Sequence, residues 1–149
     1  LSESYGVRPE FTRIEPDILR MGVPDDVDAV LLIGDEAMLF NKDGLHVIDV
    51  GDEWTKLTGL PAVFAVWAGH GINDELVSIF CEAKRAGMNM LHQIAREESI
   101  RLNLSFETCY EYLSDIIKYD MGEREIQSIE VFRRKAQAHN LLASEVFVR

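Results

Sequence analysis

The pattern with the clearest chemical potential lies where an apolar run meets a glycine and an acid. Residues 29–33 are continuously apolar, and the run ends abruptly at Gly34 and Asp35. Ligands of parallel α/β sheets gather where strands end, because glycine lets a backbone approach closely and the next helix presents N–H groups. A structural turn explains the same residues, with Gly34 permitting the turn and Asp35 capping a short helix. The local pattern favours both interpretations equally.

Other residues able to do chemistry lack the spacing that chemistry needs. Asp25, Asp26 and Asp28 do not have the spacing of a calcium loop and are typical of a solvated turn. The motif at 69–71 lacks the third glycine of a dinucleotide-binding loop. The four histidines are scattered singly: His46, His70, His92 and His139. We therefore expect no metal centre, no nucleotide chemistry and no cofactor.

Composition narrows the class of protein further. The chain has 149 residues, 47% of them hydrophobic and 28% charged, which is typical of a core-forming protein. With 15 Lys and Arg against 26 Asp and Glu, its formal charge of −11 argues against nucleic-acid binding. The apolar runs at 29–33 and 60–68 fall short of the ~20 residues of a membrane-spanning helix. Cys81 and Cys109 offer no metal or disulfide framework, and we expect two buried, reduced thiols.

Hydrophobic patterning predicts strands in the first half of the chain. Continuous or alternating apolar residues predict strands at 29–33, 45–50 and 63–67, and a weaker one at 11–14. Short helices are expected at 16–21, at 37–40 and at 51–58, the last ending at Gly59.

The second half of the chain has a helical pattern. Asn73 and Ser105 are expected to cap helices, a further helix comes after Gly122, and Asn140 is expected to end it in a left-handed conformation. Strands with short helices followed by helices predict the α/β class.

Three sequence blocks carry a resemblance to a known family. They are residues 28–37, residues 49–54 and residues 57–67, and they occur in the family's order. Together with the later segments at 112–113 and 119–123 and the expected helix that carries Phe132, they resemble chorismate dehydratase, the enzyme that opens the futalosine route to menaquinone. The resemblance extends over most of the chain.

The resemblance implies a fold and a division of the chain. The expected fold is part of a two-lobed structure similar to type II periplasmic binding proteins, with the ligand between the lobes. Residues 1–61 would belong to the second lobe, and residues 62–149 would supply a crossover strand and the helices completing the first lobe. The family carries an amino-terminal stretch before the position of Leu1, so we expect an incomplete chain.

The chemistry implied by the resemblance is the loss of water from chorismate to give 3-enolpyruvylbenzoate, in the cytoplasm and without a cofactor. An acid and a base suffice for this step. Ile33, Gly34 and Asp35 are the expected substrate-binding residues, while the catalytic base and the Ser, Thr and Asn groups that hold the dicarboxylate would lie upstream of Leu1. The isolated chain is therefore expected to be inactive.

Two other functions remain open on the sequence. A solute-binding module would close on a small carboxylate without reaction, and the dihydroxynaphthoate synthase of the same pathway shares the fold but matches the 32–35 block less well. A chain lacking most of one lobe would also expose apolar helix faces, so we expect self-association.

Overall fold

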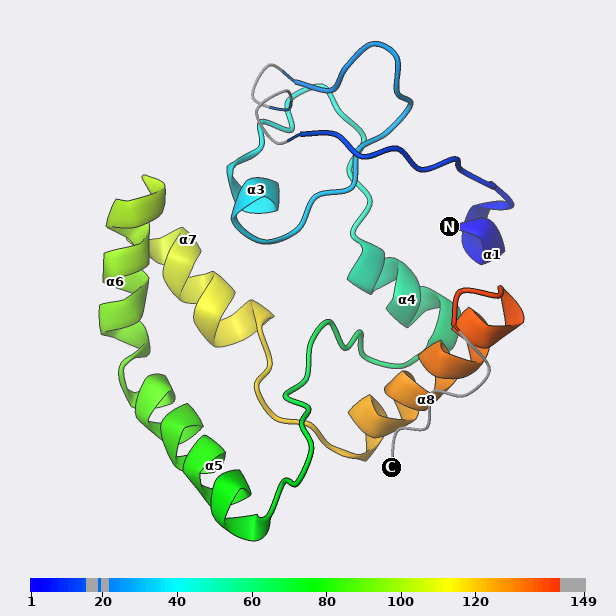
Figure 1. Cartoon of the computed structure of the whole chain (residues 1–149). Coiled ribbons are helices and arrows are strands. Elements are labelled where there is room, and N and C mark those ends of the chain that lie inside the picture. The colour runs from blue at the N-terminus through cyan, green and yellow to red at the C-terminus, as the bar shows by residue number, and fades with distance from the viewer. Residues whose placement is uncertain (16–18, 20–21, 143–149) are drawn as a thin grey trace. The chain divides into compact units, whose positions relative to one another are not determined.

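The structure is a computed structural model that describes residues 1–15, 19 and 22–142 (Figure 1). The chain divides into two compact units, Leu1–Ile48 and Asp49–Arg149, and each is described by itself. The helix expected at 16–21 falls mostly outside the described residues.

The first unit contains two short helices, α1 (Ser2–Tyr5) and α3 (Gly34–Leu39). Gly6 ends α1 in the left-handed conformation, at φ 67°. The expected strands at 11–14, 29–33 and 45–50 form no sheet pairing with other described residues, and Val50 begins the next helix. Because a strand is defined by its partner, the predicted α/β sheet stays a prediction.

The second unit begins with α4 (Val50–Thr58), where capping at both ends follows from the sequence. The Asp49 carboxylate accepts hydrogen bonds from the amides of Gly51 at 2.7 Å and Asp52 at 3.0 Å. Gly59 ends the helix at φ 72°, a left-handed conformation that glycine adopts without strain. The predicted helix and its stop are confirmed.

Helices make up most of the remainder of the second unit. In chain order they are α5 (Asp74–Asn89), α6 (Leu91–Leu102), α7 (Phe106–Glu111), the π-helix η1 (Tyr112–Ile116) and α8 (Glu123–Ala138). Asn73 caps α5 by accepting from the Leu76 amide at 2.9 Å, and Ser105 caps α7 by accepting from the Thr108 amide at 3.0 Å. Asn140 adopts φ 57°. These three predicted end signals are confirmed.

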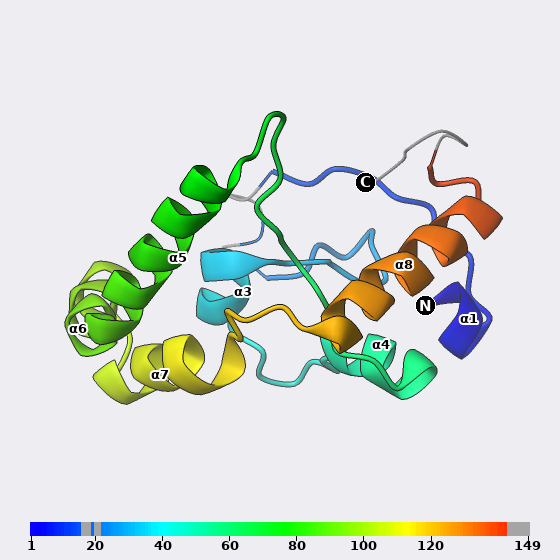
Figure 2. The ribbon, with the colours of Figure 1, turned by 90° about the horizontal axis from the view of Figure 1, so that it is seen from below.

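Two small packing centres hold the second unit together (Figure 2). Helices α6 and α7 pack through buried Ala95 and Cys109, beside an aromatic group in which His92 lies 4.7 Å from Phe106, between ring centroids. Helix α4 meets α8 where the Trp54 indole lies edge-on to Phe132, at 5.7 Å.

The structure corrects one prediction about the cysteines. Cys109 is buried as expected, but Cys81 is exposed, because its face of α5 has no described partner helix covering it.

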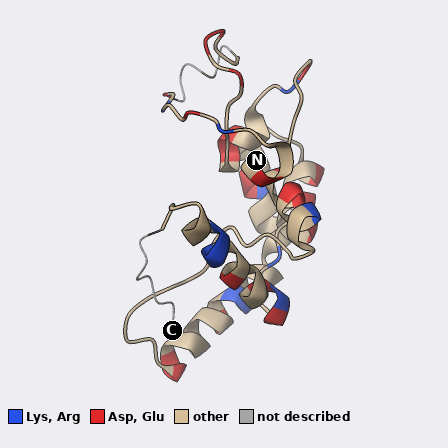
Figure 3. Cartoon of the chain, turned by 90° about the vertical axis from the view of Figure 1, so that its right-hand side faces the viewer, with Lys and Arg blue, Asp and Glu red and all other residues tan. Residues whose placement is uncertain are grey.

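Acidic and basic side chains are interspersed on the helices (Figure 3), for example in the ion pairs Lys56 to Glu53 at 2.7 Å and Arg133 to Glu130 at 2.8 Å. None of the described helices is both long and apolar enough to span a membrane.

Candidate functional site

The beginning of α3 has the backbone geometry of a sharp turn from extended chain into helix. Ile33 is extended at φ −137° and ψ 160°, and Gly34 then takes φ 60° as the first helical residue. A side chain at position 34 would be strained in this left-handed conformation, which explains the glycine. The Ile33 side chain makes no capping hydrogen bond.

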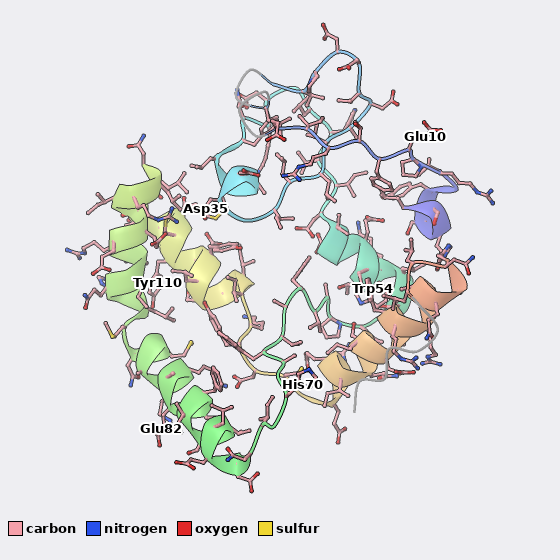
Figure 4. All side chains as sticks on the ribbon, in the orientation of Figure 1. Glu10, Asp35, Trp54, His70, Glu82 and Tyr110 are labelled. Atoms are coloured by element: carbon pink, nitrogen blue, oxygen red, sulfur yellow. The ribbon has the colours of Figure 1, made fainter. Side chains whose placement is uncertain are left out.

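Asp35 lies inside the helix rather than at its cap, so of the two interpretations left open by the sequence, the one in which Asp35 caps α3 is wrong. The helix begins one residue earlier, at Gly34, and places Asp35 and Glu36 in its first turn. Acidic side chains there are stabilised by the positive end of the helix dipole. Asp35, labelled in Figure 4, is exposed, and Ile33 is 78% exposed. The substrate-binding role of Ile33, Gly34 and Asp35 stays a prediction.

A cavity of about 430 Å³ lies beside α3 in the same unit. Its lining residues are Leu19, Gly22, Leu32, Glu36, Leu39, Phe40 and Asn41. The cavity is lined by residues adjacent to the predicted ones. Successive side chains of extended chain point to opposite sides, so Leu32 lines the cavity and Ile33 does not. Glu36 lines it and Asp35 does not, because successive residues of a helix are separated by about 100° around its axis.

The cavity joins apolar walls to two polar side chains, Glu36 and Asn41. Its size falls within the range of small-molecule sites, roughly 300–1,000 Å³. The side-chain Oδ1 of Asn41 accepts from the backbone amide of Asp43 at 3.0 Å, which fixes that side chain in its turn. A carboxylate can accept a proton and an amide can orient a ligand by hydrogen bonding. No Lys or Arg lies among the described lining residues, so the positive charge that attracts an anion is not supplied by this wall.

Sequence reasoning did not assign Glu36 and Asn41 to a site. The signals were present in both cases. Glu36 stands one residue from Asp35 in the same helical turn, and Asn41 begins the turn at 41–44. To decide whether Asp35 or Glu36 lines the cavity, one must know which side of the helix each residue occupies. That depends on the residue at which the helix begins.

A second cavity, of about 270 Å³, lies in the second unit between α5 and the segment after η1. It is lined by Lys84, Met88, Ser114, Ile117, Lys118, Tyr119 and Asp120. Its polar groups bind one another: Lys84 pairs with Asp120 at 2.5 Å, and the Tyr119 hydroxyl donates to the Leu113 carbonyl at 3.1 Å. Burial and the nearby Tyr112 raise the pKa of Tyr119. The hydrogen bonds and ion pair account for this cavity without a ligand.

The described residues contain no cluster of candidate metal ligands. No three His, Cys, Asp or Glu side chains in the described ranges lie close enough together to hold a metal ion. His92 packs against the rings of Phe106 and Tyr110 in the α6–α7 centre.

Comparison with known proteins places these features in a family. Residues 1–138 match the family described as menaquinone biosynthesis. A chorismate dehydratase of Thermus thermophilus is 29% identical over 152 aligned positions, which cover 89% of this chain and 55% of that protein. The chain thus spans about half the length of this curated relative. No solved structure matches the chain.

The family match includes α3 with its adjacent cavity and the helices of the second unit as far as the last residue of α8. The chain belongs to the menaquinone biosynthesis family.

Proposed function

We propose that this chain contributes to a chorismate dehydratase, a lyase that removes water from chorismate to give 3-enolpyruvylbenzoate. The observation that carries the proposal is the alignment with the Thermus thermophilus chorismate dehydratase across 89% of the chain. Because the alignment covers 55% of that protein, the complete activity is proposed for the whole enzyme rather than for these residues alone.

The proposed reaction needs one proton acceptor and one proton donor. A ring carbon of chorismate loses a proton, the electron pair of that bond forms the new double bond, and the hydroxyl group leaves as water after accepting a proton. The product ring is aromatic, so the elimination is strongly favoured once the groups are positioned. Carboxyl groups are suited to both proton transfers.

Two features of α3 support a role for the first unit in binding the substrate. The cavity beside α3 is large enough for a small carbocyclic acid, and its walls are mainly apolar. Asp35 and Glu36 place two carboxyl groups in one helical turn. Both are negative, so the carboxylates of chorismate must be neutralised by groups supplied from elsewhere in the whole enzyme.

A complementation assay tests the proposal. Chorismate is supplied to the 149-residue chain alone, and to the chain mixed with a polypeptide carrying the part of the Thermus thermophilus relative that the chain does not match. Chromatography tracks chorismate and 3-enolpyruvylbenzoate. We expect product in the mixture and none with either component alone.

A physical measurement separates failure of chemistry from failure of assembly. Sedimentation of the mixture establishes whether the two polypeptides associate. Association with chorismate bound and recovered intact would overturn the dehydratase and favour the non-catalytic carboxylate-binding module. A hybrid chain in which these residues replace the matching part of the Thermus enzyme repeats the test where the separate pieces do not associate.

A further inference from the structure

The turn that follows α3 contains the pair Asp43 and Gly44. No other Asp or Asn of the chain is followed by glycine. This order of residues matters chemically, because the amide nitrogen of a glycine can approach the side-chain carboxyl of the aspartate before it, whereas a larger residue hinders the approach. The pair is therefore able to react within itself, without an enzyme or a partner.

The backbone of this turn explains why glycine stands at position 44. The Leu45 amide donates to the Lys42 carbonyl at 3.1 Å, which closes a four-residue turn around Asp43 and Gly44. Gly44 takes φ 76°, a left-handed conformation, at the third position of this turn. Turns that need this conformation there accept glycine or asparagine. The residue that shapes the turn thus also leaves the Asp43 carboxyl unshielded.

Both reacting groups are accessible, because Asp43 and Gly44 are exposed. The Asp43 amide donates to Asn41, but the Asp43 carboxylate and the Gly44 amide make no hydrogen bond or ion pair with any other described residue. The reacting atoms belong to adjacent residues, so the reaction needs no surface for a partner. It needs only that the turn can flex, which a segment held by exposed local hydrogen bonds does readily.

We propose that Asp43 isomerises spontaneously to isoaspartate. The Gly44 amide nitrogen forms a bond to the carbon of the protonated Asp43 carboxyl group, and the amide hydrogen and the carboxyl hydroxyl leave together as one water molecule. The product is a five-membered succinimide ring. A second water molecule opens this ring at either carbonyl. Opening at the main-chain carbonyl leaves the chain running through the former side chain of residue 43, and opening at the other carbonyl restores aspartate.

Isoaspartate adds one carbon to the main chain inside the turn. The separation of the Lys42 carbonyl and the Leu45 amide then changes, so we expect the hydrogen bond between them to be lost. Asn41 belongs to the same segment, and its side chain both binds the Asp43 amide and lines the cavity beside α3. The modification therefore reaches the edge of that cavity, whether or not the cavity binds a substrate.

Incubation in water enriched in the heavy isotope of oxygen tests the proposal. The 149-residue chain is held at physiological temperature and pH, transferred to ordinary water and digested with trypsin, and fragmentation of peptide 43–56 locates the isotope. We expect heavy oxygen to accumulate at residue 43, because opening of the ring adds an oxygen atom from the solvent. An isomer of this peptide should also be methylated by an isoaspartyl methyltransferase, which does not modify aspartate.

Asp49 is an internal control in the same peptide. It is exposed like Asp43, but Val50 follows it and its carboxylate accepts hydrogen bonds from two amides. We expect it to gain neither heavy oxygen nor the isoaspartyl linkage.

Two variants separate the chemistry from the fold. Asp43→Glu keeps the charge but would have to form a six-membered ring, so it is expected to abolish the gain of heavy oxygen at residue 43. Gly44→Asn keeps a residue that tolerates the left-handed turn but shields the carboxyl. It is expected to slow the gain roughly tenfold, a difference of about 1.4 kcal/mol in the barrier. An unchanged rate in Gly44→Asn would contradict the role of glycine.

Three further results would overturn the proposal. One is an absence of isoaspartate at residue 43 of the folded chain when a synthetic peptide of residues 40–47 forms it under the same conditions, because the fold then protects the turn. Another is an equal gain of heavy oxygen at residues 43 and 49. The third is protection of residue 43 in the hybrid chain with the Thermus enzyme, because the remainder of that enzyme then shields the turn.

Discussion

The Trp54 indole N–H donates to the Ser128 hydroxyl oxygen at 2.8 Å, and this hydroxyl donates in turn to the Pro61 carbonyl at 2.6 Å. Ser128 is 1% exposed, so the relay lies at the centre of the contact between α4 and α8. Figure 4 labels Trp54 where these two helices lie alongside each other. The Ser128 hydroxyl of α8 thus binds both α4 and the chain that follows α4, at Pro61.

We expect Ser128→Ala to destabilise the second unit by about 1–3 kcal/mol, because the half-buried indole N–H of Trp54 and the Pro61 carbonyl both lose their partner. Denaturant unfolding in a Trp67→Phe background isolates the fluorescence of Trp54. Ser99→Ala removes an exposed hydroxyl bound to the Arg96 carbonyl and should change the stability by less than about 0.5 kcal/mol. Equal effects of the two substitutions would contradict the relay.

The cap of α4 offers a test that separates a hydrogen bond from a charge. Asp49→Ala removes the acceptor of two amide N–H groups and is expected to cost about 1 kcal/mol of unfolding free energy. Asp49→Asn keeps an oxygen acceptor and should recover most of this loss. Thermal unfolding measured in low and high salt should show Asn more stable than Ala by the same amount in both. A purely electrostatic role would instead leave Asn no better than Ala at any salt concentration, and the advantage of Asp over Ala would shrink as salt rises.

Tyr119 predicts a loss of stability at alkaline pH. Burial and the proximity of Tyr112 raise its pKa, so the folded state favours the neutral phenol. This contribution is complete below the unfolded-state pKa of about 10 and is lost as the pH rises through the folded-state value.

The near-ultraviolet absorbance of tyrosinate is recorded against pH for the unsubstituted chain and for Tyr119→Phe. The difference between the two curves gives the ionisation of Tyr119. Tyr112→Phe should move this ionisation to lower pH, because it removes one of the two causes. Tyr119→Phe should also flatten the decline of unfolding free energy at high pH, while Tyr110→Phe should not. A Tyr119 midpoint below the usual value would refute the expectation.

For the proposed enzyme, Asp35→Asn is expected to lower turnover of chorismate tenfold or more, which corresponds to about 1.4 kcal/mol in the barrier. The matched control is Asp43→Asn, which makes the same change in an exposed turn of the same unit. Glu36→Gln tests the carboxylate that lines the cavity. Unchanged kinetics for Asp35→Asn with slow kinetics for Glu36→Gln would move the site by one residue.

The helix ends were predictable from sequence because they are decided locally. Asn73, Ser105 and Gly59 act on amides or backbone angles within a few residues, and the structure confirms each of them. The Trp54 to Ser128 relay was not predictable, because it joins residues far apart in the chain. The exposure of Cys81 was missed for the same reason, since burial depends on a covering partner rather than on residue type.

The sequence marks the turn at the beginning of α3, but it does not decide which of the two acids lines the adjacent cavity. The apolar run and Gly34 mark the turn, but the choice between Asp35 and Glu36 depends on the first residue of α3. The predicted strands at 29–33, 45–50 and 63–67 stay predictions, because pairing is a property of two segments and a sequence pattern describes only one.

The π-helix η1 makes the chain after α7 sensitive to its length. The Ile117 amide donates to the Tyr112 carbonyl at 3.0 Å, five residues back, so this turn contains one residue more than an α-helical turn. Deleting one residue from 112–116 would restore ordinary helical winding and rotate the downstream segment by about 100°. Asp120 would then face away from Lys84, and the ion pair that closes the smaller cavity would be lost. At this bend, the number of residues matters more than their identity.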